Sequence, residues 1–468
     1  MIKTKTLLIA AFLFAMTNGL LPTISSAQRI ACGTFHTLAL CGDSTAMSWG
    51  YNVYGQLGNG TTTPYNVPWP VSSLGSITAV AGGGYHSLAL KNNGTVWAWG
   101  SNAFGGLGNN STTSSNVPVQ VFYCSGITAI AGGSDQSFAL KNDSTVWSWG
   151  WNSQGQLGNG TLNNSSVIVQ VSNLTGITSI AAGYVHSLAV KKDGTVWAWG
   201  NNGDGELGIN STTDSNVPVQ VFYCTGMKAV AGGYRHTIAL KNDSTVWAWG
   251  YNGLGQLGNG NNTNSNVIVP VTGLTGIIAI AAANDGSHNL ALKSDGTVWA
   301  WGWNLNGQLG NGNNTNSNVP IMVNSLTGVV AISAGSGNSL ALKNDGTLWA
   351  WGQNDYGQLG IGTLVNTNVP VQITGMCSMN SSVNKIAEQN DKINIYPNPA
   401  STILNIHHST YTSQETLLIT DLLGTVVYKE MLTGIDNTIS ISTWRAGVYF
   451  YEVRSEKGSV RGKFVKIN

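Results

Sequence analysis

The dipeptide Trp-Gly recurs seven times along the 468-residue chain, and this repetition constrains the fold more than any other feature. The tryptophans of the seven dipeptides are Trp49, Trp99, Trp149, Trp199, Trp249, Trp301 and Trp351. Their spacing is 50 residues at every step except one, which is 52 residues. A fixed period of this length is typical of proteins that repeat one supersecondary unit many times.

Each repeat contains four short apolar segments, for example residues 117–121, 127–131, 137–140 and 145–149. The segments are rich in β-branched and aromatic residues and are bounded by Gly, Asn or Asp, which indicates β-strands. Lys-Asn-Asp-Gly or a close variant joins the last two segments, and this composition favours a hairpin turn. One acidic residue per turn is too few for a calcium site. Four antiparallel strands repeated seven times predict an all-β, seven-bladed β-propeller.

The phase of the repeat suggests how the ring closes. The first repeat starts at Arg29 without an equivalent of segment 117–121, whereas the strand 369–373 is left over at the end. We therefore expect strand 369–373 to complete the first blade. Strand alternation would then place Cys41 and Cys377 at the same end of that blade, which makes a Cys41–Cys377 disulfide a possible staple of the closure.

The repeated pattern AGGYxHSLALKxDGTVWAWGxNxxGQLGxG resembles the RCC1-type repeat from about Arg29 to Ile373. The resemblance implies a seven-bladed propeller, here assigned to residues 28–377. The family includes a nuclear exchange factor for a small GTPase on chromatin and a secreted bacterial inhibitor of β-lactamases. The export signal described next makes this chain more similar to the secreted bacterial branch.

Residues 1–27 are typical of a signal peptide. Lys3 and Lys5 precede the apolar run LLIAAFLFAM, and Ser25, Ser26 and Ala27 supply small residues for cleavage. The alternative is a retained anchor helix, although the apolar run is short for a membrane span. We expect an exported protein whose mature chain starts near Gln28 and has no transmembrane segment.

The repeat stops after Cys377. A polar linker is expected at 378–392, and residues 393–468 alternate as the short strands of a small β-sandwich. Four motifs resemble the C-terminal sorting domain of the type IX secretion system; they are residues 396–399, 421–424, 446–449 and 463–467. The resemblance implies the type IX secretion machinery as a partner, and a location at the outer-membrane surface or outside the cell. An ordinary carbohydrate-binding or immunoglobulin-like module is the alternative.

Two positions vary from repeat to repeat, and alternation of the strands places both at the same end of the ring. One follows each Trp-Gly dipeptide, and the other precedes a position that is His in five repeats. Varied, aromatic-rich loops on a rigid scaffold are typical of binding surfaces. The candidate ligand-binding residues at these positions are Tyr51, Tyr85, Trp151, Arg235, Tyr251 and Trp303, and Tyr356 is added from the tip of one of the same loops. The alternative is that these loops vary without a ligand.

The near-constant positions are interpreted as structural. The two alternating tryptophans of each Trp-x-Trp-Gly strand are expected to pack in the core, with Met47 replacing the first of them in one repeat. The His position is Gln136 and Asn338 in two repeats, and these residues cannot act as acid or base near neutral pH. GQLGNG lacks the Gly-Lys-Ser/Thr of a phosphate loop.

Charge and composition narrow the function further. The formal net charge is +1, and no basic patch for nucleic acid is visible. The five cysteines include no C-x-x-C pair, and no clustered catalytic or metal-ligating set emerges, so we expect no cofactor, no metal and no enzymatic activity. The sequence predicts an exported, non-catalytic propeller that recognises a protein or glycan. The alternative is a secreted inhibitor of an extracellular enzyme, such as a β-lactamase-type target.

Overall fold

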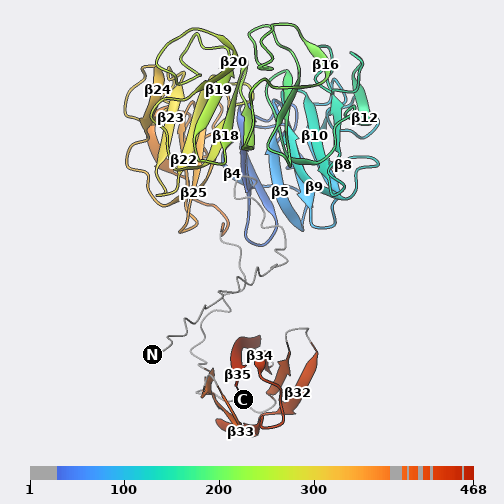
Figure 1. The fold of residues 1–468 in the computed structure, drawn as a ribbon, viewed down its shortest axis with the longest axis vertical. Coiled ribbons are helices and arrows are strands. Elements are labelled where there is room, and N and C mark those ends of the chain that lie inside the picture. The colour runs from blue at the N-terminus through green and yellow to red at the C-terminus, as the bar shows by residue number, and fades with distance from the viewer. Residues whose placement is uncertain are drawn as a thin grey trace, which may run out of the picture. The chain divides into compact units, whose positions relative to one another are not determined.

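A computed structural model describes residues 29–379, 393–397, 400–408, 415–421, 425–455 and 458–467. The chain divides into two compact units, Met1–Ser381 and Ser382–Asn468, and every regular element described in them is a β-strand (Figure 1). The predicted signal peptide and nearly all of the predicted linker lie outside the described residues. Among the residues that are described, no helix is long and apolar enough to cross a membrane.

The first unit contains seven four-stranded antiparallel sheets, each made of four consecutive strands. Blade one comprises β1 (Ile30–Cys32), β2 (His36–Leu40), β3 (Ala46–Gly50) and β4 (Tyr65–Pro70). Blade two comprises β5 (Ile77–Gly82), β6 (His86–Lys91), β7 (Val96–Gly100) and β8 (Ser115–Gln120). Blade three comprises β9 (Ile127–Gly132), β10 (Gln136–Lys141), β11 (Val146–Gly150) and β12 (Ser165–Gln170). Blade four comprises β13 (Ile177–Ala182), β14 (His186–Lys191), β15 (Val196–Gly200) and β16 (Ser215–Gln220).

The remaining three blades follow the same order. Blade five comprises β17 (Met227–Gly232), β18 (His236–Lys241), β19 (Val246–Gly250) and β20 (Ser265–Pro270). Blade six comprises β21 (Ile277–Ala282), β22 (His288–Lys293), β23 (Val298–Gly302) and β24 (Ser317–Met322). Blade seven comprises β25 (Val329–Ala334), β26 (Asn338–Lys343), β27 (Leu348–Gly352) and β28 (Thr367–Gln372).

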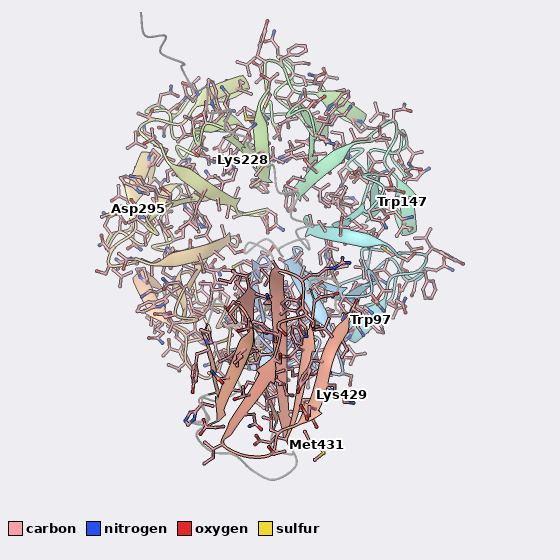
Figure 2. All side chains as sticks on the ribbon, turned by 60° about the horizontal axis from the view of Figure 1, so that its bottom comes forward. Trp97, Trp147, Lys228, Asp295, Lys429 and Met431 are labelled. Carbon is pink, nitrogen blue, oxygen red and sulfur yellow. A yellow bond between two sulfur atoms is a disulfide. The ribbon has the colours of Figure 1, made fainter. Side chains whose placement is uncertain are left out.

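The sheets stand radially around one axis, so the prediction of an all-β, seven-bladed propeller is confirmed (Figure 2, in which Trp97, Trp147 and Asp295 mark blades two, three and six). The first strand of each blade is innermost and the fourth is outermost. The seven innermost strands surround a central channel with a cavity of about 200 Å³. Small and apolar side chains from β1, β5, β9 and their equivalents line most of this cavity.

The predicted closure by strand 369–373 is wrong. The outer strand β28 pairs with β27 of its own blade, where Gln372 lies opposite Trp349. Blade one has its own outer strand, because Tyr65 pairs with Gly50 and Trp69 pairs with Ser48. Its sequence, Tyr-Asn-Val-Pro-Trp, is the blade-one copy of the Ser-Asn-Val-Pro-Val strand, so each blade begins with its innermost strand and no strand is left over.

Blades seven and one are instead joined by the contacts that join every other pair of neighbouring blades. The backbone carbonyl of Gln358 in blade seven accepts hydrogen bonds from Trp49 Nε1 at 3.0 Å and from Thr37 Oγ1 at 2.8 Å. The structure also contains the Cys41–Cys377 disulfide, across a sequence separation of 336 residues. The disulfide fastens the chain that leaves blade seven to blade one, and the amide of Gly42 donates to the Ser378 carbonyl at 2.7 Å beside it.

The two tryptophans of each Trp-x-Trp-Gly strand have different environments, which corrects the expectation that both are core residues. The second one is fully buried in all seven blades; this set is Trp49, Trp99, Trp149, Trp199, Trp249, Trp301 and Trp351. The first one, as at Trp97, is only partly buried at the blade surface. In five blades a lysine ammonium lies over the ring of the first tryptophan, at 5.0 Å in the case of Lys141 and Trp147.

The second unit is a small β-sandwich, as predicted. One sheet contains β29 (Ile393–Tyr396), β30 (Ile403–His408) and β33 (Asp436–Ser440), and the other contains β32 (Val426–Met431), β31 (Thr416–Thr420), β34 (Gly447–Ser455) and β35 (Gly458–Lys466). Leu404 and Ile406 of the first sheet pack with Leu417 and Phe464 of the second in one buried core. Part of the predicted turn 421–424 lies outside the described residues.

We predict that replacing both Cys41 and Cys377 with Ser lowers the thermal unfolding temperature of the propeller. The crosslink closes a loop of more than three hundred residues, and its loss costs up to about 5 kcal/mol in the chain-entropy view. Differential scanning calorimetry with and without a reductant measures the effect. The reductant should lower the unfolding temperature of the wild type and leave the double variant unchanged; equal unfolding temperatures for all four samples would contradict the prediction.

Candidate functional site

The two variable positions of each repeat lie at one end of the propeller, which we call the loop face. It consists of the turn between the first two strands of each blade, as at residues 33–35, and the long loop after the third strand, as at 51–64. The two positions are bonded to each other in every blade. In blade one the amide of Tyr51 donates to the Phe35 carbonyl at 2.8 Å, and in blade three that of Trp151 donates to the Asp135 carbonyl at 3.1 Å.

The glycine of the Trp-Gly dipeptide, which precedes the variable residue of the long loop, makes this hydrogen bond possible. Gly50 has φ 103°, and a Cβ added to it would lie 2.4 Å from the Phe35 carbonyl oxygen. The same conformation, with φ from 101° to 104°, recurs at Gly100, Gly150, Gly200, Gly250, Gly302 and Gly352. Any other residue would be strained there, so the Gly of each Trp-Gly dipeptide aims the following side chain.

A buried asparagine braces each long loop. Asn52 Oδ1 accepts a hydrogen bond from the Leu57 amide at 2.9 Å, and its Nδ2 donates to the carbonyls of Thr61 at 3.1 Å and Thr63 at 2.9 Å. Equivalent bonds are made by Asn102, Asn152, Asn202, Asn252, Asn304 and Asn354. The asparagine was visible in all seven repeats, but sequence reasoning gave it no role. It makes the loops fixed supports for the side chains that they display.

Three of the predicted site residues meet in an aromatic cluster that spans blades seven, one and two. Its members are Phe35, Tyr51, Tyr54, Tyr85 and Tyr356. The ring centroids of Tyr51 and Tyr356 are 4.9 Å apart, and those of Tyr54 and Tyr85 are 5.5 Å apart. Each member is at least partly exposed. Phe35 and Tyr54 therefore join the site although they were not among the predicted residues.

Two further predicted residues belong to a second group, which we call the aromatic arc, on blades two to five. Trp151 stacks on Phe104 with centroids 5.7 Å apart and contacts Tyr184 at 6.5 Å. Tyr184 lies 4.8 Å from Tyr234, whose ring is covered by the Arg235 guanidinium at 5.1 Å. Arg235 also forms an ion pair with Asp204 at 3.2 Å.

Tyr251 and Trp303 stand apart from both groups. Their amides make the same loop-face bonds, to the Arg235 carbonyl at 2.8 Å and the Ser287 carbonyl at 2.9 Å. In the part of the chain that the structure describes, neither ring contacts another aromatic ring. The hydroxyl of Tyr251 lies so close to Gly253 that a Cβ there would be 2.3 Å away, which shows that this ring folds over its own loop.

A two-residue insertion in blade six occupies the centre of the loop face, and no role was predicted for it from the sequence. It causes the single 52-residue step of the repeat and lengthens the turn after β21 with Asn284 and Asp285. Asn284 Nδ2 donates to the Gly132 carbonyl at 3.1 Å and, more weakly, to that of Gly82 at 3.3 Å. The side chain thus crosses the channel from blade six to blades three and two.

Asp285 ties the same insertion to the neighbouring blades on the other side. Thr34 Oγ1 of blade one donates to Asp285 Oδ2 at 2.9 Å, and Ser336 Oγ of blade seven donates to the Asp285 carbonyl at 3.0 Å. Burial raises the pKa of Asp285 to about 6, with a further increase from the charge of nearby Asp135. The hydrogen bond from Thr34 acts in the opposite direction and lowers the pKa. Burial also raises the pKa of Asp135.

The repeated histidines hold blades together and do not face a ligand. His86 is fully buried, and its Nε2 lies 2.8 Å from Ser137 Oγ of the next blade. Because Ser137 Oγ donates its own proton to the Gly106 carbonyl, it accepts from His86, which fixes the neutral tautomer. Burial lowers the pKa of His86 to about 4.

No group of three or more His, Cys, Asp or Glu suited to a metal occurs among the described residues.

Four family models match parts of the chain. An RCC1-like domain matches residues 163–391, and a regulator of chromosome condensation (RCC1) repeat matches 46–90 and 93–140. A second model of that repeat matches 27–56, 77–105 and 127–156. A secretion system C-terminal sorting domain matches 394–467.

Solved structures share the propeller fold. Yeast RCC1 (Prp20), in its complex with Kap60, has a TM-score of 0.64 and 22% identity over 75% of this chain and 84% of its own. Human WBSCR16 has a TM-score of 0.64 and 24% identity over 70% of this chain and 94% of its own. Both identities are low, so the likeness concerns the fold alone.

We predict that Glu206→Gln stabilises the propeller at and above neutral pH. Glu206 is fully buried on the loop face, where five other blades have Gln, and its Oε2 accepts a hydrogen bond from the Asp204 amide at 2.9 Å. Burial raises the pKa of Glu206 from an ordinary 4.5 to about 7. The folded state thus keeps a proton that the unfolded chain releases above pH 4.5, so the wild type loses stability as pH rises through 4.5 to 7.

Urea unfolding at several pH values measures this effect. The advantage of Glu206→Gln should be near zero at pH 4 and approach ~3 kcal/mol at pH 8, following the size of the pKa shift. The reciprocal variant Gln256→Glu, at the equivalent position of blade five, should lose stability over the same range. If the wild type and Glu206→Gln depend equally on pH, the raised pKa of Glu206 is wrong.

Proposed function

We propose that this chain, an RCC1-repeat propeller with a type IX secretion sorting domain, is an exported binding protein that recognises an extracellular protein or glycan through its loop face. The sorting domain indicates export to the cell surface or to the medium. The observation that carries the proposal is the assembly of the aromatic cluster and the aromatic arc from six different blades on one end of the ring.

The physical form of the loop face suits recognition. Tyrosine and tryptophan provide a large contact area and have few rotatable bonds, so little conformational entropy is lost when a partner binds. The loops that carry them are already fixed by the buried asparagines, as at Asn52 and Asn152. A preorganised surface needs less ordering on binding and therefore retains more of its interaction energy.

The proposal assigns the loop face to recognition of a partner. The rigidity of this face also suits the second candidate function, inhibition of an extracellular enzyme. A rigid surface with central aromatic residues can cover an active site and exclude water from it. Under that alternative the partner would be an enzyme that loses activity when the propeller binds.

We predict that the triple variant Tyr51→Ala, Trp151→Ala, Tyr356→Ala loses partner binding. Truncating one hot-spot aromatic residue of an interface costs about 2 kcal/mol or more, and such losses are not additive. The affinity of the triple variant should therefore fall by about 100-fold or more. The purified mature protein is used to capture partners from the extracellular fraction, and the captured material is also tested for inhibited enzyme activity. A glycan array is probed with the same proteins.

The matched control replaces three exposed aromatic residues away from the loop face, Trp69, Tyr123 and Tyr223, with Ala. The control should bind like the wild type. If the loop-face variant keeps every partner, or if the control loses them equally, the assignment of the binding surface to the loop face is wrong.

We also predict that deleting residues 393–468 traps the protein in the periplasm, because these residues contain the sorting domain. Cell fractionation and surface labelling report the location, with Cys41→Ser, Cys377→Ser as a control that alters the propeller but keeps the tail. Normal appearance of the truncated protein at the surface or in the medium would contradict the assignment of residues 393–468 to sorting.

A further inference from the structure

The two ends of the propeller carry opposite charge. The loop face has one cationic residue, Arg235, and six acidic residues, which are Asp135, Asp204, Glu206, Asp214, Asp285 and Asp355. The other end, which we call the turn face, has the hairpin turns such as Lys343–Gly346 and most of the lysines. Its cationic residues are Arg29, Lys91, Lys141, Lys191, Lys192, Lys228, Lys241, Lys293 and Lys343, against Asp43, Asp143, Asp193, Asp243, Asp295 and Asp345. A partner of the loop face is therefore expected to be basic.

The acidic charge is least compensated at the centre of the loop face. Asp204 is paired with Arg235, whereas Asp135 and Asp285 form no ion pair with any residue that the structure describes. Burial raises the pKa of Asp285, and the charge of nearby Asp135 raises it further. Burial also raises the pKa of Asp135, so each carboxylate would gain from a cation brought into its surroundings.

Aromatic rings flank the same carboxylates. Burial and then the charge of Asp285 raise the pKa of Tyr85 to about 12, and the pKa of Tyr184 is raised by the same two causes in the same order. Both rings thus lie within electrostatic reach of Asp285. Tyr85 belongs to the aromatic cluster and Tyr184 to the aromatic arc, so the carboxylates lie where the two groups meet. Aromatic faces beside carboxylates are the usual surroundings of a bound organic cation.

A buried acceptor without a donor lies in the same turn as Asp285. Asn284 is only 6% exposed and lines the channel cavity, and its Oδ1 has no hydrogen-bond partner while its Nδ2 is bound to backbone carbonyls. Leaving a buried acceptor unpaired costs about 1–3 kcal/mol. An ammonium or guanidinium group carries donors and no acceptor. It would give this oxygen the donor that it lacks, and the two carboxylates the counter-charge that they lack.

We propose that the channel mouth, formed by Tyr85, Asp135, Tyr184, Asn284 and Asp285, receives a lysine or arginine side chain of the protein partner. This inference rests on the proposed function and narrows it from a protein or glycan to a protein with an exposed basic side chain. The carboxylates attract the cation, the rings of Tyr85 and Tyr184 contact its aliphatic stem and its charge, and Asn284 Oδ1 accepts one of its protons. A neutral glycan would leave the carboxylates without a counter-charge.

Binding of a basic peptide to the mature protein tests the proposal. The probes are deca-lysine and, as a neutral comparison, deca-glutamine, measured by titration calorimetry at low salt. The test variant is Asp135→Asn with Asp285→Asn, because Asn keeps the acceptor for Thr34 Oγ1 and removes only the charge. The control is Asp295→Asn with Asp345→Asn, which removes the same charge from the turn face.

The expected result is that the wild type binds deca-lysine and not deca-glutamine, that the test variant binds deca-lysine at least tenfold more weakly, and that the control changes affinity by less than twofold. Tyr184→Leu should weaken binding, and Tyr184→Phe should keep it. Equal losses in the test and control variants would overturn the proposal, because they would show an effect of net charge alone. Unchanged binding in the test variant would overturn it as well.

Capture of the natural partner separates this inference from the proposed function. If the Tyr51, Trp151, Tyr356 variant loses the partner while the Asp135, Asp285 variant keeps it, the loop face binds and the cation site is wrong. If the partner is a neutral glycan, the cation site is also wrong. Loss of a protein partner in both variants supports both proposals, provided that near-ultraviolet circular dichroism shows the variants to be folded.

Discussion

The contact on which the rest of the propeller depends is a hydrogen bond from a buried indole to the neighbouring blade. In each blade the second tryptophan of the Trp-x-Trp-Gly strand donates its Nε1 proton to a backbone carbonyl in the long loop of the preceding blade, as Trp99 does to Gln56 at 2.9 Å. The indole packs in the core between the two sheets, so one side chain secures both the blade interface and the loop. Glycines such as Gly58, with φ 65°, let the loop come close to the ring.

The same contact explains why recognition can be built on this scaffold. The carbonyl that accepts the indole belongs to the loop whose first residue is a variable position, and a buried asparagine fixes the remainder of that loop. Residues such as Tyr51 and Trp151 can therefore differ between blades without loosening the ring. In the loop face, the buried indole and asparagine that hold each loop are the same in every blade, whereas the displayed side chains differ from blade to blade. Variation in the sequence suggests such an arrangement but does not show what holds the loops.

The sequence predicted the fold well and the closure badly, for a definite physical reason. A period of four strands establishes which strands pair but not where the unit begins, since any cyclic shift of the pattern fits the same repeat. The predicted phase put the 117–121-type strand first in each repeat and so counted the Tyr65–Pro70 strand with the second repeat, whereas it is the fourth strand of blade one. The Cys41–Cys377 disulfide was nevertheless anticipated, because both cysteines lie at the turn face whichever blade holds the last strand.

The site could be predicted only in part. Alternation correctly located the variable positions at one end, but the rings that touch, such as Tyr51 and Tyr356, come from the two extremes of the repeat array and meet only when the ring is closed. The insertion was visible as a step of 52 residues, yet its role depends on the carbonyls that Asn284 reaches in other blades.

That insertion also bears on how such a ring can evolve. Repeat proteins commonly gain and lose units, because each unit contacts mainly its neighbours. The turn of blade six, however, has hydrogen-bond partners in five other blades. They are the Thr34 hydroxyl of blade one, the Gly82 carbonyl of blade two, the Gly132 carbonyl of blade three, the Tyr234 amide of blade five and the Ser336 hydroxyl of blade seven. Adding or removing one blade would leave these groups out of reach of one another. The central turn therefore fits this chain only to a ring of seven blades in this order, even where the outer strands are nearly interchangeable.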